Sequence, residues 1–144
     1  MITYDELNEQ NHKITELSNV LAILLKDRLI CDSETCCKLF FNYIDRVNEH
    51  MHDVEANLYT DLLRHSSSEI NNTAKNFMSG SQEIKRIMNS YVKKWCNKSS
   101  QALSIGKNHE KFMRETDEMF EMVLSRIQSE IEHLYPTIRA VNSA

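Results

Sequence analysis

The segment EHMHDVEANLY, residues 49–59, carries histidine and carboxylate side chains at spacings close to those of a metal site. A histidine and a carboxylate one helical turn apart lie on one face, where they can bind iron or zinc together. Here His50 is followed at that spacing by Val54, and Glu55 is preceded at that spacing by Met51. In either register an apolar side chain occupies one ligand position, so the segment provides half of a helical metal site.

A second set of ligand-type side chains comes from four cysteines and a histidine, which are scattered along the chain: Cys31, Cys36, Cys37, Cys96 and His109. Sulfur and imidazole ligands suit zinc or an iron–sulfur cluster, and exposed thiols at a helix N-terminus have lowered pKa values and oxidise readily. The spacing is not that of a CxxC pair, however, and free cysteines are often simply buried. A redox or metal site and plain packing are both open interpretations.

Long helices are the elements expected to position these residues. The chain has 144 residues with only two glycines and one proline, which is few for a protein with many turns. This length suits one domain spanning residues 1–144, with a core large enough to need no covalent staples. The composition therefore favours a few long helices joined by short connections.

The first two helices have clear boundaries. Thr3 to Glu6 fits a capping box, and the first helix should end within residues 27–32. Asp32 and Ser33 are good N-caps for the second helix. Its apolar residues alternate at steps of four and three: Phe40, Ile44, Val47, Met51, Val54, Leu58 and Leu62.

The last two helices follow the same pattern. Ser66 and Glu69 fit another capping box, and the fourth helix follows a loop at residues 97–107 until Pro136 ends or kinks it. Four helices of similar length with short connections predict an all-α, up-down-up-down four-helix bundle. In that topology the four cysteines and His109 gather at one pole.

Several polar residues interrupt the predicted core. Ser81 lies on the apolar line of the third helix and Glu130 on that of the fourth, with Arg126 one turn before it, and Asn11 continues the stripe of the first helix. At about 1.5 Å per residue, these positions and Met51 fall within a turn or two of one level. Because a buried charge is costly unless it is paired, we expect a polar layer in the core.

Two segments of the chain resemble signatures of a known family. EHMHDVEANLYTDLL and RIQSEIEHLYPTI are similar to the two His-x-x-x-Glu-(x)-x-x-Leu-Phe/Tyr-Pro signatures of the hemerythrin-like (HHE cation-binding) family. NHKITELSNVL resembles the first helix of that family, and the likeness extends over residues 3–140. The resemblance implies a four-helix bundle with a non-haem di-iron centre, used for oxygen carriage, oxygen sensing or iron–nitric-oxide chemistry.

The resemblance also implies where the metal ligands should be. His50 and Glu130 take a His and a Glu position, whereas Val54, Arg126 and Ser81 stand where a Glu and two His are expected. The implied ligand set is therefore incomplete.

Two further ligands, His12 and Glu55, would complete the set only after local rotation of their helices. His12 has Thr15, Glu16 and Asn19 on its face, which is therefore polar.

Two interpretations of Arg126 follow. Its guanidinium can replace the charge of the metal, forming a polar layer of Asn11, Ser81, Arg126 and Glu130 with His50 nearby. Alternatively, the side chain extends out to solvent from the flank of the helix. The first interpretation predicts no cofactor, whereas an atypical site would hold two irons, and the cysteine pole could bind zinc.

Composition narrows the function further. The formal charge of −4 gives no basic footprint for nucleic acid, and neither a membrane span nor a signal peptide is evident. We therefore expect a cytoplasmic monomer or homodimer with reduced cysteines and an unknown protein partner. The first hypothesis is a binding or signalling module, not an enzyme, that acts through its surface or its cysteine pole. The alternative is an active iron protein that binds or senses oxygen or nitric oxide.

Overall fold

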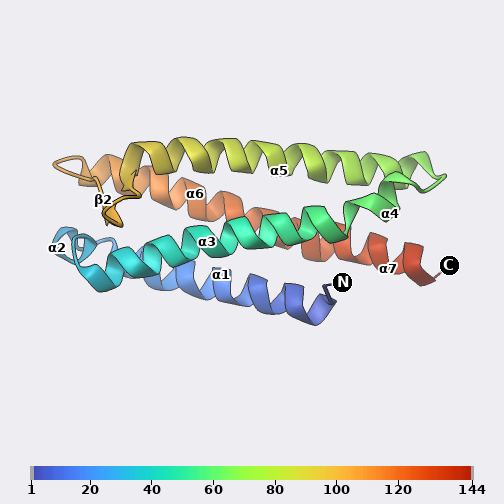
Figure 1. Ribbon diagram of the computed structural model, residues 1–144, viewed down its shortest axis with the longest axis horizontal. Coiled ribbons are helices and arrows are strands. Elements are labelled where there is room, and N and C mark those ends of the chain that lie inside the picture. The colour runs from blue at the N-terminus through green and yellow to red at the C-terminus, as the bar shows by residue number, and fades with distance from the viewer. Residues whose placement is uncertain (1, 144) are drawn as a thin grey trace.

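The computed structural model describes residues 2–143, and the predicted all-α class is confirmed. Four long helices run along the long axis of the molecule (Figure 1): α1 (Tyr4–Leu24), α3 (Glu34–Asn57), α5 (Ser68–Trp95) and α6 (His109–Ser129). Shorter elements connect or extend them: α2 (Arg28–Cys31), α4 (Tyr59–Leu63), the strands β1 (Cys96–Asn97) and β2 (Ala102–Leu103), the π-helix η1 (Glu130–Leu134) and α7 (Tyr135–Ser143). Helix α1 packs against α3 and α6, and α5 packs against the same two helices.

The predicted helix starts are correct for α1 and α3 and wrong by one residue for α5. The Thr3 hydroxyl accepts a hydrogen bond from the Glu6 backbone N–H at 3.1 Å, and the Glu6 carboxylate accepts from the Thr3 N–H at 3.3 Å, which completes the capping box. Ser33 caps α3. Helix α5 is capped by Ser67 rather than Ser66, because His65 accepts a hydrogen bond from the Ser67 N–H at 3.0 Å.

The predicted second helix is interrupted near its end. Helix α3 ends at Asn57 and α4 begins at Tyr59, although Leu58 and Leu62 remain buried as the apolar pattern predicts. The Asn57 side chain donates to the Asp53 carbonyl at 2.8 Å, and such local bonds compete with helical backbone pairing.

The fourth helix is also irregular, but Pro136 does not end it. The π-helix η1 follows α6, and the Tyr135 N–H bonds to the Glu130 carbonyl, one residue further back than in an α-helix. Proline lacks an N–H and crowds the carbonyl four residues earlier, so a wider turn just before it lets the chain continue into α7.

The loop predicted at residues 97–107 contains an antiparallel hairpin, in which Cys96 pairs with Leu103 and Asn97 pairs with Ala102. The low glycine content gave no sign of these short strands.

The apolar core is divided into two clusters. One lies toward the hairpin end and includes Ile14, Met51, Ile84 and Ile127. The other lies toward the two chain ends and includes Leu7, Val54, Ala74, Leu134 and Tyr135. Along each long helix the transition between the clusters falls at the positions that were predicted to form a polar layer.

No helix within residues 2–143 combines the length and the apolar character that crossing a bilayer requires.

Candidate functional site

A layer of buried polar side chains separates the two apolar clusters. Glu130 has an exposed fraction of 0%, Ser81 of 1%, His50 of 2% and Asn11 of 4%. The Arg126 side chain is 8% exposed, so the structure places the guanidinium inside and not out in solvent. The layer thus brings together all four residues of the predicted polar layer, with His50 beside them.

Arg126 makes the most contacts in this layer. Its Nε donates to Glu130 Oε2 at 3.0 Å, and its Nη1 donates to the Phe77 carbonyl at 3.0 Å. Its Nη2 donates to the Tyr59 hydroxyl at 2.6 Å and to the Ser81 hydroxyl at 2.8 Å. The guanidinium carbon also lies 4.7 Å from the centre of the Phe77 ring, a favourable cation–π distance.

Glu130 accepts hydrogen bonds from both sides. Its Oε1 lies 2.6 Å from His50 Nε2 and accepts a bond from the Tyr135 hydroxyl at 3.2 Å, while Oε2 faces Arg126. The Tyr135 hydroxyl in turn accepts from Asn11 Nδ2 at 3.2 Å. Within residues 2–143, Asn11 Oδ1 is buried without a hydrogen-bond partner.

His50 has a hydrogen-bond partner at each ring nitrogen. Gln10 Nε2 donates to the Asp53 carboxylate at 2.7 Å, which turns Gln10 Oε1 toward His50 Nδ1 at 2.8 Å. Both ring nitrogens of His50 therefore face acceptors, an amide oxygen and the Glu130 carboxylate. Glu130 thus lies between the His50 ring and the Arg126 guanidinium.

His50 and Arg126 keep Glu130 ionised. Burial alone acts to raise its pKa, but the hydrogen bond and charge of His50 and the charge of Arg126 outweigh burial, so the pKa is lowered. Burial also raises the pKa of Tyr59 and of Tyr135, so both phenols stay protonated. The layer is a set of fixed charges with neutral hydroxyl groups around them.

Sequence reasoning missed Tyr59 and Tyr135 as members of the layer. The signal was present, because each tyrosine ends one of the two Leu-Tyr segments, Leu58-Tyr59 and Leu134-Tyr135, that contribute to the family resemblance. Gln10 was missed as well, because on sequence alone it lies beside the predicted core stripe.

Gly80 gives the guanidinium room. A Cβ at this position would lie 2.9 Å from Arg126 Nη1, closer than real Cβ contacts allow. In an ordinary helix Gly→Ala stabilises by about 1 kcal/mol. We expect Gly80→Ala instead to destabilise by about 1–3 kcal/mol, because the hydrogen-bonded guanidinium must shift. Urea unfolding measures this, with the exposed Ser79→Ala as control; a more stable Gly80→Ala variant would contradict it.

Two of the four implied metal ligands lie away from the layer. His12 is 73% exposed and lies 3.7 Å from Glu16, because it is one residue past the buried Asn11 and so points to solvent. Glu55 forms an ion pair with Lys85 at 2.6 Å. These two positions are corrections to the implied ligand set.

The residues present do not fit a di-iron centre. Across the described positions, no group of three or more His, Cys, Asp or Glu side chains could hold a metal ion. His50 and Glu130 bond directly to each other, and Arg126 brings a permanent positive charge to the place where the resemblance implies a metal. A ferrous or ferric pair would meet strong repulsion and too few donors.

The cysteine pole is a packed region. Cys31, Cys36 and Cys37 are buried in the apolar cluster at the hairpin end, with Cys96 packed against it. Cys31 Sγ donates to the Leu25 carbonyl at 3.3 Å. His109 is also at this end, where its Nε2 donates to the same carbonyl at 2.7 Å.

The thiols at this pole are weak acids. Burial raises the pKa of Cys36 to about 11 and that of Cys96 to about 12, and it also raises the pKa of Cys31. This is opposite to the lowered values expected for thiols at a helix N-terminus, because the side chains lie in the core rather than at the exposed helix end. The structure therefore gathers these residues without activating them.

We expect the native thiols to react slowly with a disulfide reagent at pH 8. For Cys36, the rise in pKa from 9.0 to about 11 leaves about a hundredfold less thiolate. Titration in buffer and in urea would measure this: the four thiols should react rapidly only after unfolding. A Ser99→Cys variant supplies an exposed control thiol; buried thiols that react as fast as this one would contradict the prediction.

Scans against protein-family models, curated proteins and solved structures found no match to this chain. The hemerythrin resemblance therefore depends on the segments quoted above and on the layout of the polar layer.

Proposed function

We propose that this chain is a hemerythrin-like four-helix bundle of up-down-up-down topology whose centre uses an internal ion pair in place of a metal. In this proposal it acts as a metal-free binding or signalling module in the cytoplasm, with a protein partner and without catalysis. The observation that carries the proposal is the set of four hydrogen-bond acceptors around the Arg126 guanidinium: Glu130, Ser81, Tyr59 and the Phe77 carbonyl.

The positions of these residues support the proposal. His50 and Glu130 occupy a His and a Glu position of the resemblance, and Arg126 and Ser81 occupy two positions where His is expected. Each is buried, and each bonds to another member of the layer. A random set of core polar residues has no reason to coincide with these positions.

Charge balance supports it as well. A buried carboxylate needs a cation, and in a metalloprotein the metal supplies it. Here Arg126 supplies it from the protein itself, so the bundle can fold without any ion. In this proposal the module acts through its surface, because His50, Glu130, Arg126 and Ser81 are already hydrogen-bonded to one another.

Metal analysis of protein purified without chelators and without air tests the proposal. We expect less than stoichiometric iron and an absorption spectrum with only the Trp and Tyr bands. Two irons per chain, with near-ultraviolet and visible bands of an oxo-bridged centre, would reject the metal-free module. That result would favour the alternative, an iron protein that binds or senses oxygen or nitric oxide.

A further inference from the structure

Exposed apolar side chains gather on α1 and α2. Of the six large hydrophobic residues that are exposed within residues 2–143, four lie on these two helices: Val20 at 41%, Ile23 at 70%, Leu29 at 84% and Ile30 at 36%. Single exposed apolar residues are normal, but a cluster at one end of a protein marks an interaction surface. Val20 and Ile23 are three residues apart, so they form one ridge on the outer side of α1.

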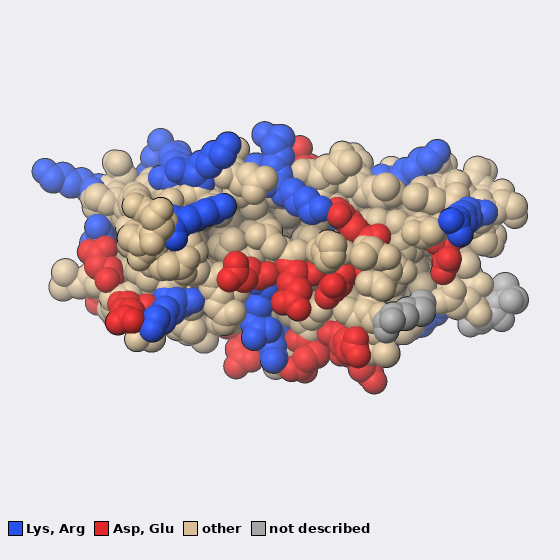
Figure 2. Space-filling view, in the orientation of Figure 1, with Lys and Arg blue, Asp and Glu red and all other residues tan. Residues whose placement is uncertain are grey.

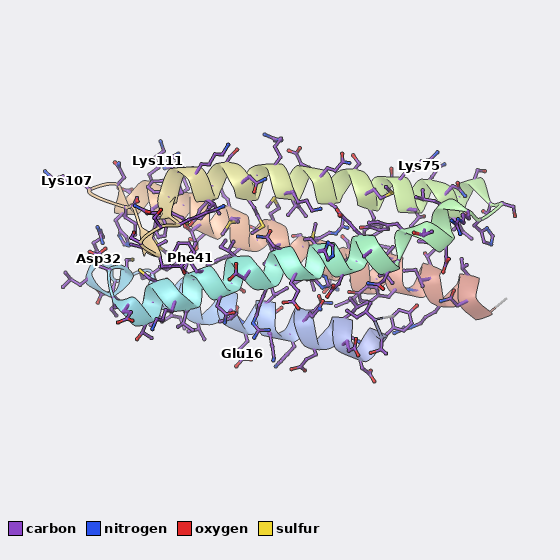
Figure 3. The ribbon with its side chains drawn as sticks, in the orientation of Figure 1. Glu16, Asp32, Phe41, Lys75, Lys107 and Lys111 are labelled. Atoms are coloured by element: carbon purple, nitrogen blue, oxygen red, sulfur yellow. The ribbon has the colours of Figure 1, made fainter. Side chains whose placement is uncertain are left out.

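A groove between α1 and α3 lies beside this ridge. Leu17 and Val20 from α1 and Leu39 from α3 supply its apolar part, and Lys13, Glu16 and Arg46 supply its charges. Figure 3 shows Glu16 on the edge of α1 that faces away from α5. The same face thus has a ridge, a groove and charges of both signs.

Two charges of this groove, those of Glu16 and Arg46, are available to a partner, whereas Lys13 already lies 3.8 Å from Glu9. Arg46 forms no ion pair with any residue in the part of the chain that the structure describes, and Glu16 has only His12, at 3.7 Å. Acidic side chains are numerous elsewhere on α1 and α3, as Figure 2 shows. Most of these lie at the other end of the two helices: Asp5, Glu6, Glu9, Glu49, Asp53 and Glu55.

We infer that this face, which we call the α1/α3 face (Lys13, Glu16, Leu17, Val20, Ile23, Leu39 and Arg46), binds a second copy of this chain through a two-fold axis parallel to the helices. Such an axis places α1 of one protomer opposite α3 of its partner at the same height. An interface of this kind must be self-complementary, and a ridge beside a groove meets that need. This inference does not depend on the proposed function.

The heights of Glu16 and Arg46 along their helices support this two-fold arrangement. The bond between Gln10 and His50 marks one height shared by the antiparallel helices α1 and α3. Six residues further along α1 is Glu16, and four residues back along α3 is Arg46, so these two also lie within one turn of a common level. The two-fold axis therefore brings Glu16 of each protomer to Arg46 of the other, which forms two equivalent ion pairs beside the apolar ridge.

A dimer of standard size buries about 800 Å² on each partner. The ridge and the groove walls together extend from Lys13 to Ile23, three turns of α1, and from Leu39 to Arg46 on α3. Leu29 and Ile30 on α2 are further exposed apolar residues, a few positions beyond the end of α1. A face of this extent suits a helix-pair interface between two copies.

Light scattering coupled to size exclusion, from 1 to about 100 µM protein, tests the inference. We expect a mass of twice 16.9 kDa, the mass of one chain. Val20→Asp combined with Ile23→Asp should give the mass of one chain with an unchanged helical circular dichroism spectrum. The control, Ile131→Asp, changes a residue that is 43% exposed elsewhere and should remain dimeric. A wild-type monomer at the highest concentration, or a dimer that persists in the double variant, would overturn the inference.

Charge reversal tests whether Glu16 of each protomer pairs with Arg46 of the other. Glu16→Arg and Arg46→Glu should each raise the dimer dissociation constant by about tenfold, because each places like charges opposite one another twice. The two substitutions together should restore dissociation close to the wild-type value. If the combined variant is weaker than either single one, the two-fold arrangement is wrong.

Discussion

Replacing Arg126 with methionine should lower the free energy of unfolding by about 3–5 kcal/mol, the cost of removing one partner of a buried ion pair. Methionine preserves most of the length of the side chain but removes the charge. Glu130, with an exposed fraction of 0%, would then keep only His50 and Tyr135 as partners. The Tyr59 and Ser81 hydroxyls and the Phe77 carbonyl would lose a donor at the same time.

Urea unfolding followed by circular dichroism measures this effect. The matched control is Arg86→Met, which removes an exposed arginine from its pair with Glu83 and should change stability little. The combination Arg126→Met, Glu130→Leu and His50→Leu should recover most of the loss, because an apolar layer leaves no buried charge without a partner. If Arg126→Met unfolds at the wild-type urea concentration, the guanidinium does not stabilise the layer.

The elements and their buried faces were predictable from the sequence because helical periodicity is a strong and local signal. The line from Phe40 to Leu62 is buried at every predicted position, although the helix is broken at Leu58. Helix breaks depend on local competition for hydrogen bonds, as at Asn57, and so they escape a periodicity argument. Periodicity did not indicate the π-helix before Pro136 either, because that turn results from the missing N–H and the bulk of the proline ring.

The members of the layer were partly predictable. Polar residues on the apolar lines identified Asn11, Ser81 and Glu130, because a single position on a helix determines which face a side chain occupies. Arg126 was identified by its place one turn before Glu130, on a neighbouring flank. The same geometry explains why His12, one residue past Asn11, is exposed.

What the sequence could not supply was the reach of long side chains. Tyr59 and Tyr135 enter the layer through their hydroxyl groups from positions a turn or more away, and Gln10 connects His50 to Asp53 from beside the stripe. These contacts depend on rotamers that only packing selects.

The sequence left open whether the cysteines form a reactive site or pack in the core, for a related reason. Position at a helix N-terminus lowers the pKa of a thiol only when the thiol remains near solvent and the helix end. Cys36 has an exposed fraction of 1%, and burial dominates. Sequence position alone does not show which of the two effects is larger.

Reintroducing the residues that the resemblance implies should create a metal site in this layer. The variant Val54→Glu, Ser81→His and Arg126→His removes the permanent cation and adds one carboxylate and two imidazoles beside His50 and Glu130. Val54 has an exposed fraction of 0%. It belongs to the apolar cluster toward the two chain ends, together with Tyr59 and Tyr135, whose hydroxyls reach the layer. These donors suit a divalent first-row metal.

We expect the variant to retain at least one Co²⁺ per chain after desalting, with visible d–d bands, whereas the wild-type chain retains none. The control Asn48→Glu, Ser79→His and Arg114→His adds the same side chains at exposed positions and should retain none either. Because two buried carboxylates without the Arg126 cation are unstable in the absence of an ion, Co²⁺ should also increase the unfolding temperature of the variant but not of the control. A folded variant that binds no Co²⁺, or an unfolded one that Co²⁺ does not restore to helix, would show that these positions do not converge as ligands. The coincidence between the layer and the metal positions of the hemerythrin-like family would then have no structural basis. Binding at the layer alone would mean that three side chains, Val54, Ser81 and Arg126, separate a metal-free core from a metal site.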